Sequence, residues 1–168
     1  TKWFDTNYHY LVPELSPDQA FALSSTKPTS ELAEARALGV PAKPVLIGPI
    51  TYLLLARMHE SSASPLTILE ALLPVYAEII AGLAAGAAEW IQLDEPALVL
   101  DRTPAELAAV SRAYTALNEA KGTARLLVQT AYGHAGESYQ TLTALPVDGI
   151  GLDLSERGRA NLDLIDKH

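Results

Sequence analysis

Asp94 and Glu95 are the pair of residues best suited to chemistry in this sequence. They follow an apolar run that begins at Trp90 and are followed by Pro96. One carboxyl group could donate a proton and the other accept one, or one could bind a substrate amine. Neighbouring residues of a strand point to opposite sides, so only one of the two can face a site. The alternative is structural: Asp94 caps the turn through Pro96 and Glu95 forms an ion pair.

Polar residues also follow three other apolar runs of the chain. Residues 48–51 follow the run that ends at Ile47, residues 129–132 follow the run that ends at Val128, and Asp153 follows the run that ends at Leu152. In parallel α/β folds, functional groups gather beyond the carboxyl ends of the strands. We therefore expect all four polar segments to line one end of a sheet.

The sequence does not predict a metal, nucleotide or serine-hydrolase site. It has no cysteine, and its four histidines, His9, His59, His134 and His168, have no familiar metal-ligand spacing. We expect His9, between two tyrosines, to be a buried hydrogen-bonded imidazole, and the terminal His168 to be solvated. No glycine-rich phosphate loop and no Gly-x-Ser-x-Gly elbow occurs in the chain.

The four apolar runs are short and rich in branched residues, as buried parallel strands are; they cover residues 44–47, 90–93, 124–128 and 149–152. Three helices are predicted among them. The first has Thr29 and Ser30 as candidate caps and ends at Gly39, the second runs from Ser64-Pro65 to residue 87, and the third runs from a capping box at Thr103 to Gly122. Alternating strands and helices predict a parallel sheet, closed as a (β/α)8 barrel or open as a doubly wound fold.

The composition is typical of a single globular domain that covers residues 1–168. Hydrophobic residues make up 49% of the chain and charged residues 19%, and the net charge of −8 disfavours nucleic acid and anionic membranes as partners. The longest apolar stretch, residues 66–88, is interrupted by Glu70, Pro74 and Glu78, so we expect no membrane span. A cytoplasmic location follows as the default expectation.

Three stretches together resemble the N-terminal half of cobalamin-independent methionine synthase. They are TKWFDTNYHY at residues 1–10 with VPE at residues 12–14, KPVLIGPIT at residues 43–51, and WIQLDEPAL at residues 90–98. Their order and spacing agree with that family, and TALPV at residues 143–147 fits as well. The resemblance spans most of the chain.

The resemblance implies an enzyme of two (β/α)8 barrels that moves a methyl group from 5-methyltetrahydropteroyltriglutamate to homocysteine. In this family zinc activates the homocysteine thiol in the C-terminal barrel, through a His-x-Cys pair whose counterpart here is Thr130-Ala131-Tyr132. We therefore expect no metal ligand and no cofactor in this chain. By position, Asp94 and Asp153 correspond to residues of that second site, and they stay candidate strand-end residues together with Glu95.

Lys2 matches the family's lysine that binds the anionic glutamate tail of the folate, a role suited to an ammonium group. Asn7 is a second candidate for the same contact. We therefore expect substrate binding here through Lys2 and Asn7, and no catalytic residue.

The length accommodates about five of the eight strands of a full barrel, which needs roughly 200 residues or more. We thus expect a partial N-terminal barrel that supplies scaffold and folate-tail contact, is inactive without the catalytic C-terminal barrel, and self-associates through its open sheet edges. Two other functions remain: a noncatalytic structural or binding module, and a different barrel enzyme that works through Asp94 and Glu95.

Overall fold

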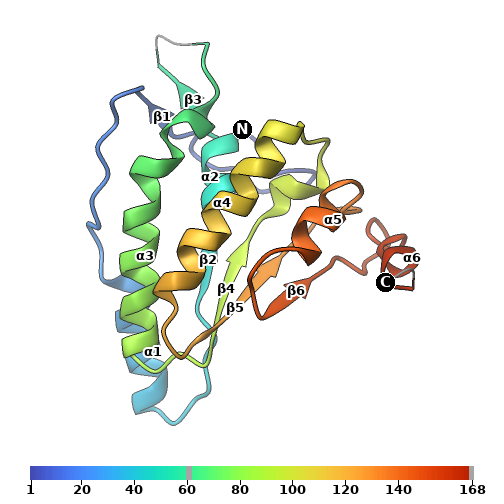
Figure 1. Cartoon of the computed structure of the whole chain (residues 1–168). Helices are drawn as coiled ribbons and strands as arrows, with labels where there is room; N and C mark the ends of the chain where they lie inside the picture. The colour runs from blue at the N-terminus through green and yellow to red at the C-terminus, as the bar shows by residue number, and fades with distance from the viewer. Residues whose placement is uncertain (60–61, 167–168) are drawn as a thin grey trace.

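The computed structural model describes residues 1–59 and 62–166, and its centre is a parallel sheet (Figure 1). This main sheet has the strand order β2-β4-β5-β6, with the bounds Val45–Ile47, Trp90–Asp94, Arg125–Gln129 and Gly149–Gly151. A second parallel pair joins β1 (Glu14–Leu15) to β3 (Arg57–Met58). The prediction of an α/β fold built from parallel βα units is confirmed. The described strands form one four-stranded and one two-stranded sheet, where we expected about five strands.

Six α-helices occur in the described part of the chain: α1 (Lys27–Ala37), α2 (Pro49–Leu54), α3 (Leu69–Ala85), α4 (Pro104–Ala120), α5 (Ser138–Thr143) and α6 (Asn161–Ile165). Two 3-10 helices, η1 (Pro65–Ile68) and η2 (Pro96–Val99), precede α3 and α4. The predicted second helix is thus η1 followed by α3, and its Ser64 cap accepts a hydrogen bond from the backbone of Leu66.

The capping box predicted at the start of α4 is confirmed. The Thr103 hydroxyl accepts a hydrogen bond from the Glu106 backbone at 3.3 Å, and the Glu106 carboxylate accepts one from the Thr103 backbone at 2.7 Å. Gly122 follows the helix with a positive φ of 55°, a conformation that favours glycine. Local sequence therefore fixed both ends of this helix.

Helix α1 begins earlier than its predicted caps. Its N-cap is Thr26, and Pro28 lies within the first two helical positions, where its fixed φ suits a helix start. Thr29 and Ser30 therefore lie inside the first turn, where their hydroxyls bond back to Thr26. The predicted end is correct, since Gly39 has a φ of +70° just beyond the helix.

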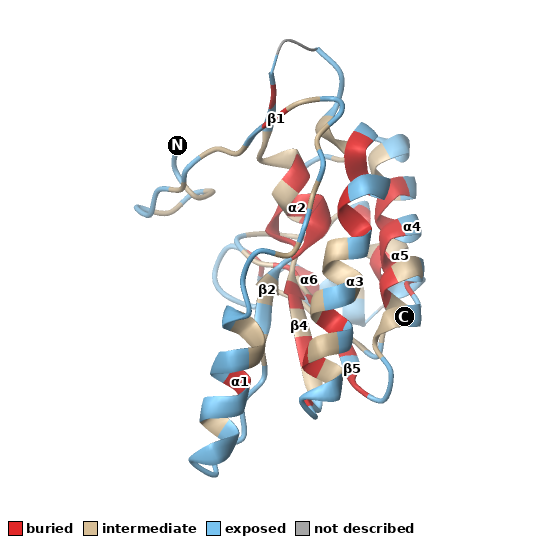
Figure 2. Cartoon of the chain, turned by 90° about the vertical axis from the view of Figure 1, so that its left-hand side faces the viewer, coloured by how far each residue is buried: buried red, intermediate tan, exposed pale blue. Residues whose placement is uncertain are grey.

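The two faces of the main sheet have different surroundings. Alternate residues of the two central strands, Ile91, Leu93, Leu126 and Val128, are fully buried. They lie in the same core cluster as residues of α3 and α4, and the buried residues of these helices are coloured red in Figure 2. On the opposite face, Val45 is 51% exposed and Ile47 is 39% exposed. The helices α3 and α4 therefore cover one face of the sheet and leave the opposite face more open.

The segment Pro65–Ala85, which comprises η1 and α3, is the one described helix long and apolar enough to cross a membrane by length and composition. Core helices share this property. Helix α3 packs against α1, α2 and α4, and it buries Leu69, Leu72, Leu73, Ile80 and Leu83. Its apolar face thus has partners within the protein.

We predict that the chain self-associates through the open face and the unpaired edge of β2. Val45→Lys should shift the chain toward monomer, because a charge on an edge strand opposes strand pairing and removes exposed apolar surface. Thr115→Lys on the exposed surface of α4 is the matched control and should leave the mass unchanged. Light scattering at micromolar concentration measures the outcome, and a monomeric unmodified chain would contradict the prediction.

Candidate functional site

A cavity of about 370 Å³ lies beyond the carboxyl ends of β5 and β6. Its walls are residues 129–132 and 152–155, two of the four polar segments that we expected at this end of the sheet. Parallel pairing sets Gln129 opposite Gly151, so the loops that follow these strands start at the same level. The register of the β5–β6 pair therefore places residues 129–132 beside residues 152–155.

Asp153 lies in this cavity as an ionised carboxylate. Partial burial opposes the charge and raises its pKa, but hydrogen bonds from Ser155 and from the backbones of Tyr132 and Gly133 outweigh that effect and lower the pKa below its usual value. The Ser155 backbone donates at 2.8 Å. Asp153 thus presents a negative charge beside Tyr132.

Glu95 is 0% exposed and does not reach any solvent-filled space. Its carboxyl oxygens accept hydrogen bonds from the Ile50 backbone at 3.1 Å, the Thr51 backbone at 2.6 Å and the Tyr114 hydroxyl at 2.8 Å. The first two donors belong to the first turn of α2, whose N-cap, Gly48, has no side chain to accept them. Glu95 therefore caps α2 from the end of a neighbouring strand.

Burial raises the pKa of Glu95 from 4.5 to about 7, although hydrogen bonds from Thr51, Tyr114 and Ile50 oppose that increase. Glycine at position 48 is required by this contact, since a Cβ atom there would lie 2.2 Å from the Glu95 carboxyl. Glu95 makes no ion pair among the described residues, so the ion pair considered for it is absent there.

Asp94 lies on the other side of β4, as strand alternation predicts. Its carboxylate accepts a hydrogen bond from the Gln92 side chain at 2.7 Å, on the open face of the sheet. The backbone carbonyl of Asp94 also accepts from Gly48 at 2.7 Å, which joins β4 to the start of α2. The carboxyl groups of Asp94 and Glu95 thus lie on opposite sides of β4 and do not form one acid-base pair.

The N-terminal segment, residues 1–10, folds back on itself near the same strand ends. Trp3 donates from its backbone to Tyr8 at 2.8 Å, and Lys2 pairs with His9 as an antiparallel bridge. The Trp3 indole donates to the Tyr132 hydroxyl at 3.2 Å. Contacts between residues far apart in sequence therefore join this segment to the cavity wall.

Lys2 and Asn7 are both exposed on that segment. Neither side chain has a hydrogen-bond or ion-pair partner among residues 1–59 and 62–166. The structure thus brings Lys2 to the same end of the molecule as Tyr132 and Asp153, and it leaves the ammonium group available for an anionic ligand.

Asn161 is a fully buried polar residue that sequence reasoning missed. Its amide donates to the backbone carbonyls of Gly133 at 3.1 Å and Asp153 at 2.7 Å, and its oxygen accepts from Ala135 at 2.9 Å. One side chain thereby ties together the loops after β5 and β6. No local pattern around residue 161 indicates this role, because its partners lie 8 to 28 residues away in sequence and are brought together only by the fold.

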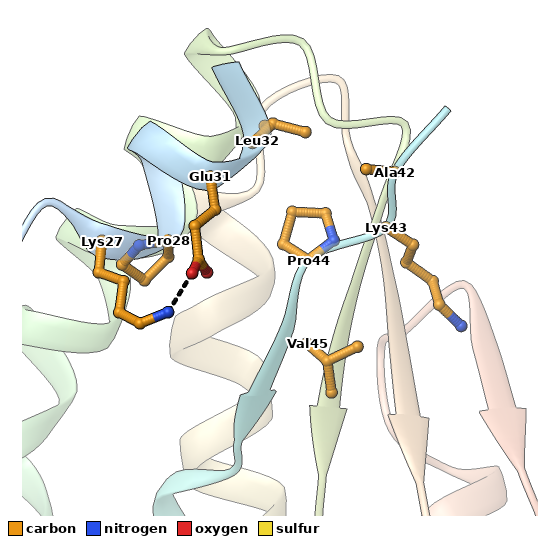
Figure 3. Close-up of a pocket in the computed structure, with 8 residues that line it drawn as sticks. All are labelled: Lys27, Pro28, Glu31, Leu32, Ala42, Lys43, Pro44 and Val45. Carbon is orange, nitrogen blue, oxygen red and sulfur yellow. Dashed lines mark hydrogen bonds and ion pairs between the residues drawn. The ribbon is translucent and has the colours of Figure 1, made fainter. Parts of the chain in front are cut away.

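Another cavity, of about 390 Å³, lies between α1 and the residues before β2 (Figure 3). Lys27, Glu31 and Lys43 are among its lining residues, and Lys27 pairs with Glu31. This cavity is at the amino ends of the strands, where parallel folds seldom place function. We therefore base the candidate site on the strand-end cavity.

No group of three or more His, Cys, Asp or Glu side chains in the described residues could hold a metal ion. His9 is exposed, so the prediction of a buried imidazole is wrong; its backbone pairs with Lys2, and its ring lies outside the core. His134 accepts a hydrogen bond from Gly136 through Nδ1 at 3.2 Å. His168 lies outside the described residues.

The family model for the N-terminal domain of cobalamin-independent synthase matches residues 1–168. The chain belongs to this family. A 5-methyltetrahydropteroyltriglutamate–homocysteine methyltransferase of Streptomyces avermitilis is 55% identical over 168 residues, which are 98% of this chain and 22% of that relative. Its counterpart in Caulobacter vibrioides is 55% identical over 154 residues, which are 92% of this chain and 20% of that relative.

The structural comparison agrees with the family at the level of fold. A B12-independent methionine synthase from Shewanella sp. W3-18-1, solved in complex with selenomethionine, has a TM-score of 0.60 at 18% identity. The match covers 78% of this chain and 43% of that one. This member of the synthase family thus has the βα units of the barrel, and it spans about a fifth of the length of the curated relatives it matches.

We predict that the pKa of Glu95 makes folding dependent on pH. The pKa is about 7 in the folded chain against 4.5 as the ordinary value, so the folded state binds more protons between these limits. The free energy of unfolding should therefore fall as pH rises from about 4.5 to about 7, by on the order of 3 kcal/mol.

Glu95→Gln should remove this slope, because an amide does not ionise. It should also lower stability at pH 5 by about 1 to 3 kcal/mol, since its NH2 group faces a backbone donor of α2. Urea unfolding across this pH range measures both effects. Equal slopes in the variant and the unmodified chain would exclude Glu95 as the titrating group.

We predict that Asn161→Ala lowers the free energy of unfolding by about 1 to 3 kcal/mol, because it leaves buried backbone groups of the two strand-end loops without partners. Asn118→Ala is the matched control, since the buried Asn118 Oδ1 has no hydrogen-bond partner in the described structure. Urea unfolding should show the larger loss for Asn161. If both variants lose the same free energy, the hydrogen bonds of Asn161 contribute no particular stability.

Proposed function

We propose that this chain contributes to methyl transfer from 5-methyltetrahydropteroyltriglutamate to homocysteine, by supplying barrel scaffold and a contact to the glutamate tail of the folate. Membership of the synthase family supports this proposal, as do the relatives that are named for this reaction. The chain matches about a fifth of their length, so the reacting groups are proposed to lie in other parts of such an enzyme.

The observation that carries the proposal is the exposed Lys2 on a segment fixed at the strand ends. A triglutamate tail carries several carboxylates, and a free ammonium group binds such groups through charge-assisted hydrogen bonds. Asn7 lies on the same segment and could donate its amide NH2 group to the same ligand. Anchoring of the segment reduces the entropy lost when the ligand binds.

The zinc associated with this family does not fit the residues described here. The chain has no cysteine, and its described His, Asp and Glu side chains form no group of three that could hold a metal ion. The described residues therefore provide no zinc site, and activation of the thiol is proposed to occur in the C-terminal barrel that the resemblance implies.

Acid-base catalysis by Asp94 and Glu95 together is not favoured by their positions. Glu95 is enclosed by the first turn of α2 and by Tyr114, and Asp94 points to the opposite face of β4. A substrate could reach Asp94 but not both carboxyl groups. A noncatalytic binding module remains compatible with the same geometry, and it shares the folate-tail contact proposed here.

Lys2→Ala should weaken binding of 5-methyltetrahydropteroyltriglutamate by about 1.5 to 3 kcal/mol, the range for a hydrogen bond to a charged group. Binding of the monoglutamate should change much less, because it lacks most of the tail. Calorimetry of the chain with both folates measures the difference. Lys27→Ala, at the other end of the strands, is the matched control. Unchanged triglutamate affinity in Lys2→Ala would remove Lys2 from the site.

A further inference from the structure

Two aromatic residues with positive φ stack directly on each other. Phe4 has a φ of 47° and Tyr132 a φ of 71°, and among the described residues only Ala87 is another non-glycine residue with positive φ. The two rings lie 5.5 Å apart with an interplanar angle of 17°. A left-handed backbone is costly for bulky residues and persists where the surroundings enforce it. The contact therefore holds two strained backbones in place.

Further contacts join the same two parts of the chain. The Trp3 indole donates to the Tyr132 hydroxyl at 3.2 Å, and the Trp3 ring meets Phe4 edge-on at 5.1 Å. Asp5 forms an ion pair with Arg157, which lies in the loop after β6. Three consecutive residues of the N-terminal segment are thus tied to the strand-end loops.

Because the N-terminal segment is a hairpin, the contacts made by Trp3, Phe4 and Asp5 also restrict the position of Lys2. Lys2 pairs with His9, and Tyr10 donates from its backbone to Thr1 at 3.0 Å. Lys2 is two residues from Phe4, and both lie in the same hairpin. A contact that fixes Phe4 therefore limits where the Lys2 ammonium group can lie.

We propose that Tyr132 is a positioning residue, which holds the N-terminal segment so that Lys2 faces the ligand at the carboxyl ends of the strands. This inference rests on the proposed function, since it assigns to Tyr132 a role in the same folate-tail site. Tyr132 acts through Lys2 and does not itself bind the tail.

A ligand-free measurement tests whether Tyr132 fixes the segment. In a Trp90→Phe background Trp3 is the remaining tryptophan, and its quenching by acrylamide reports how freely the segment moves. Tyr132→Ala should increase the quenching constant about twofold or more, whereas Tyr132→Phe, which keeps the ring stack, should have a smaller effect. Tyr8→Ala, which removes an exposed ring of the same segment, is the matched control. Unchanged quenching in Tyr132→Ala would overturn the proposal.

A double-mutant cycle then tests whether Tyr132 acts through Lys2. Tyr132→Ala should weaken triglutamate binding about two- to tenfold in the chain with Lys2 and should have no further effect in Lys2→Ala. Independent, additive losses would mean that Tyr132 contacts the ligand directly, which overturns a positioning role. If Tyr132→Ala does not fold, Asp5→Asn takes its place, because it breaks the ion pair with Arg157 without changing any residue of the strand-end loops. It should cause a smaller loss of triglutamate affinity, which also disappears in Lys2→Ala.

The two experiments separate the two proposals. If the unmodified chain binds no triglutamate, or if Lys2→Ala binds it normally, the proposed function fails, and quenching of Trp3 still decides whether Tyr132 fixes the segment. If Lys2→Ala loses affinity and Tyr132→Ala does not, the folate-tail contact stands and the positioning role of Tyr132 is excluded.

Discussion

A buried carboxyl group holds together the junction on which the covered side of this fold depends. Glu95, at the end of β4, accepts hydrogen bonds from the first turn of α2 and from Tyr114 of α4. Helix α2 starts with glycine and proline and so has no side-chain cap of its own. Hydrogen bonds from Thr51, Tyr114 and Ile50 satisfy this buried carboxyl group, although burial still outweighs them and raises its pKa to about 7. The same contact requires the absence of a side chain at Gly48.

The junction occupies only one side of β4, the side that faces the helices. Successive residues of a strand point to opposite faces of the sheet. Since the Glu95 side chain points toward the helices, the Asp94 side chain points toward the open face. Parallel register then gathers the loops after β5 and β6 at one end, where Asn161 joins them. The N-terminal segment meets these loops through Tyr132. The core junction at the end of β4 and the cavity beyond β5 and β6 are therefore separate structures.

Family membership and geometry contribute different information about function. The family model assigns the chain to the N-terminal domain of cobalamin-independent synthase, and the named relatives are methyltransferases of which it matches about a fifth. The structure adds that Lys2 and Asn7 are exposed on a segment tied to the strand ends. Residues such as Glu95, which look catalytic in the sequence, can instead be part of the core, because a motif records residue type and order but not which side of the sheet each residue faces.

Sequence by itself determined the four strands of the main sheet, the capping box of α4 and the ends of α1 and α4 at Gly39 and Gly122, because these features depend on neighbouring residues. It missed α2, the role of Asn161 and the exposure of His9. Helix α2 is capped by a side chain 44 or 45 residues away, and Asn161 bonds to groups 8 to 28 residues away. Only the tertiary structure decides such contacts, because the partners of a buried polar group are set by the packing of distant segments and not by local spacing.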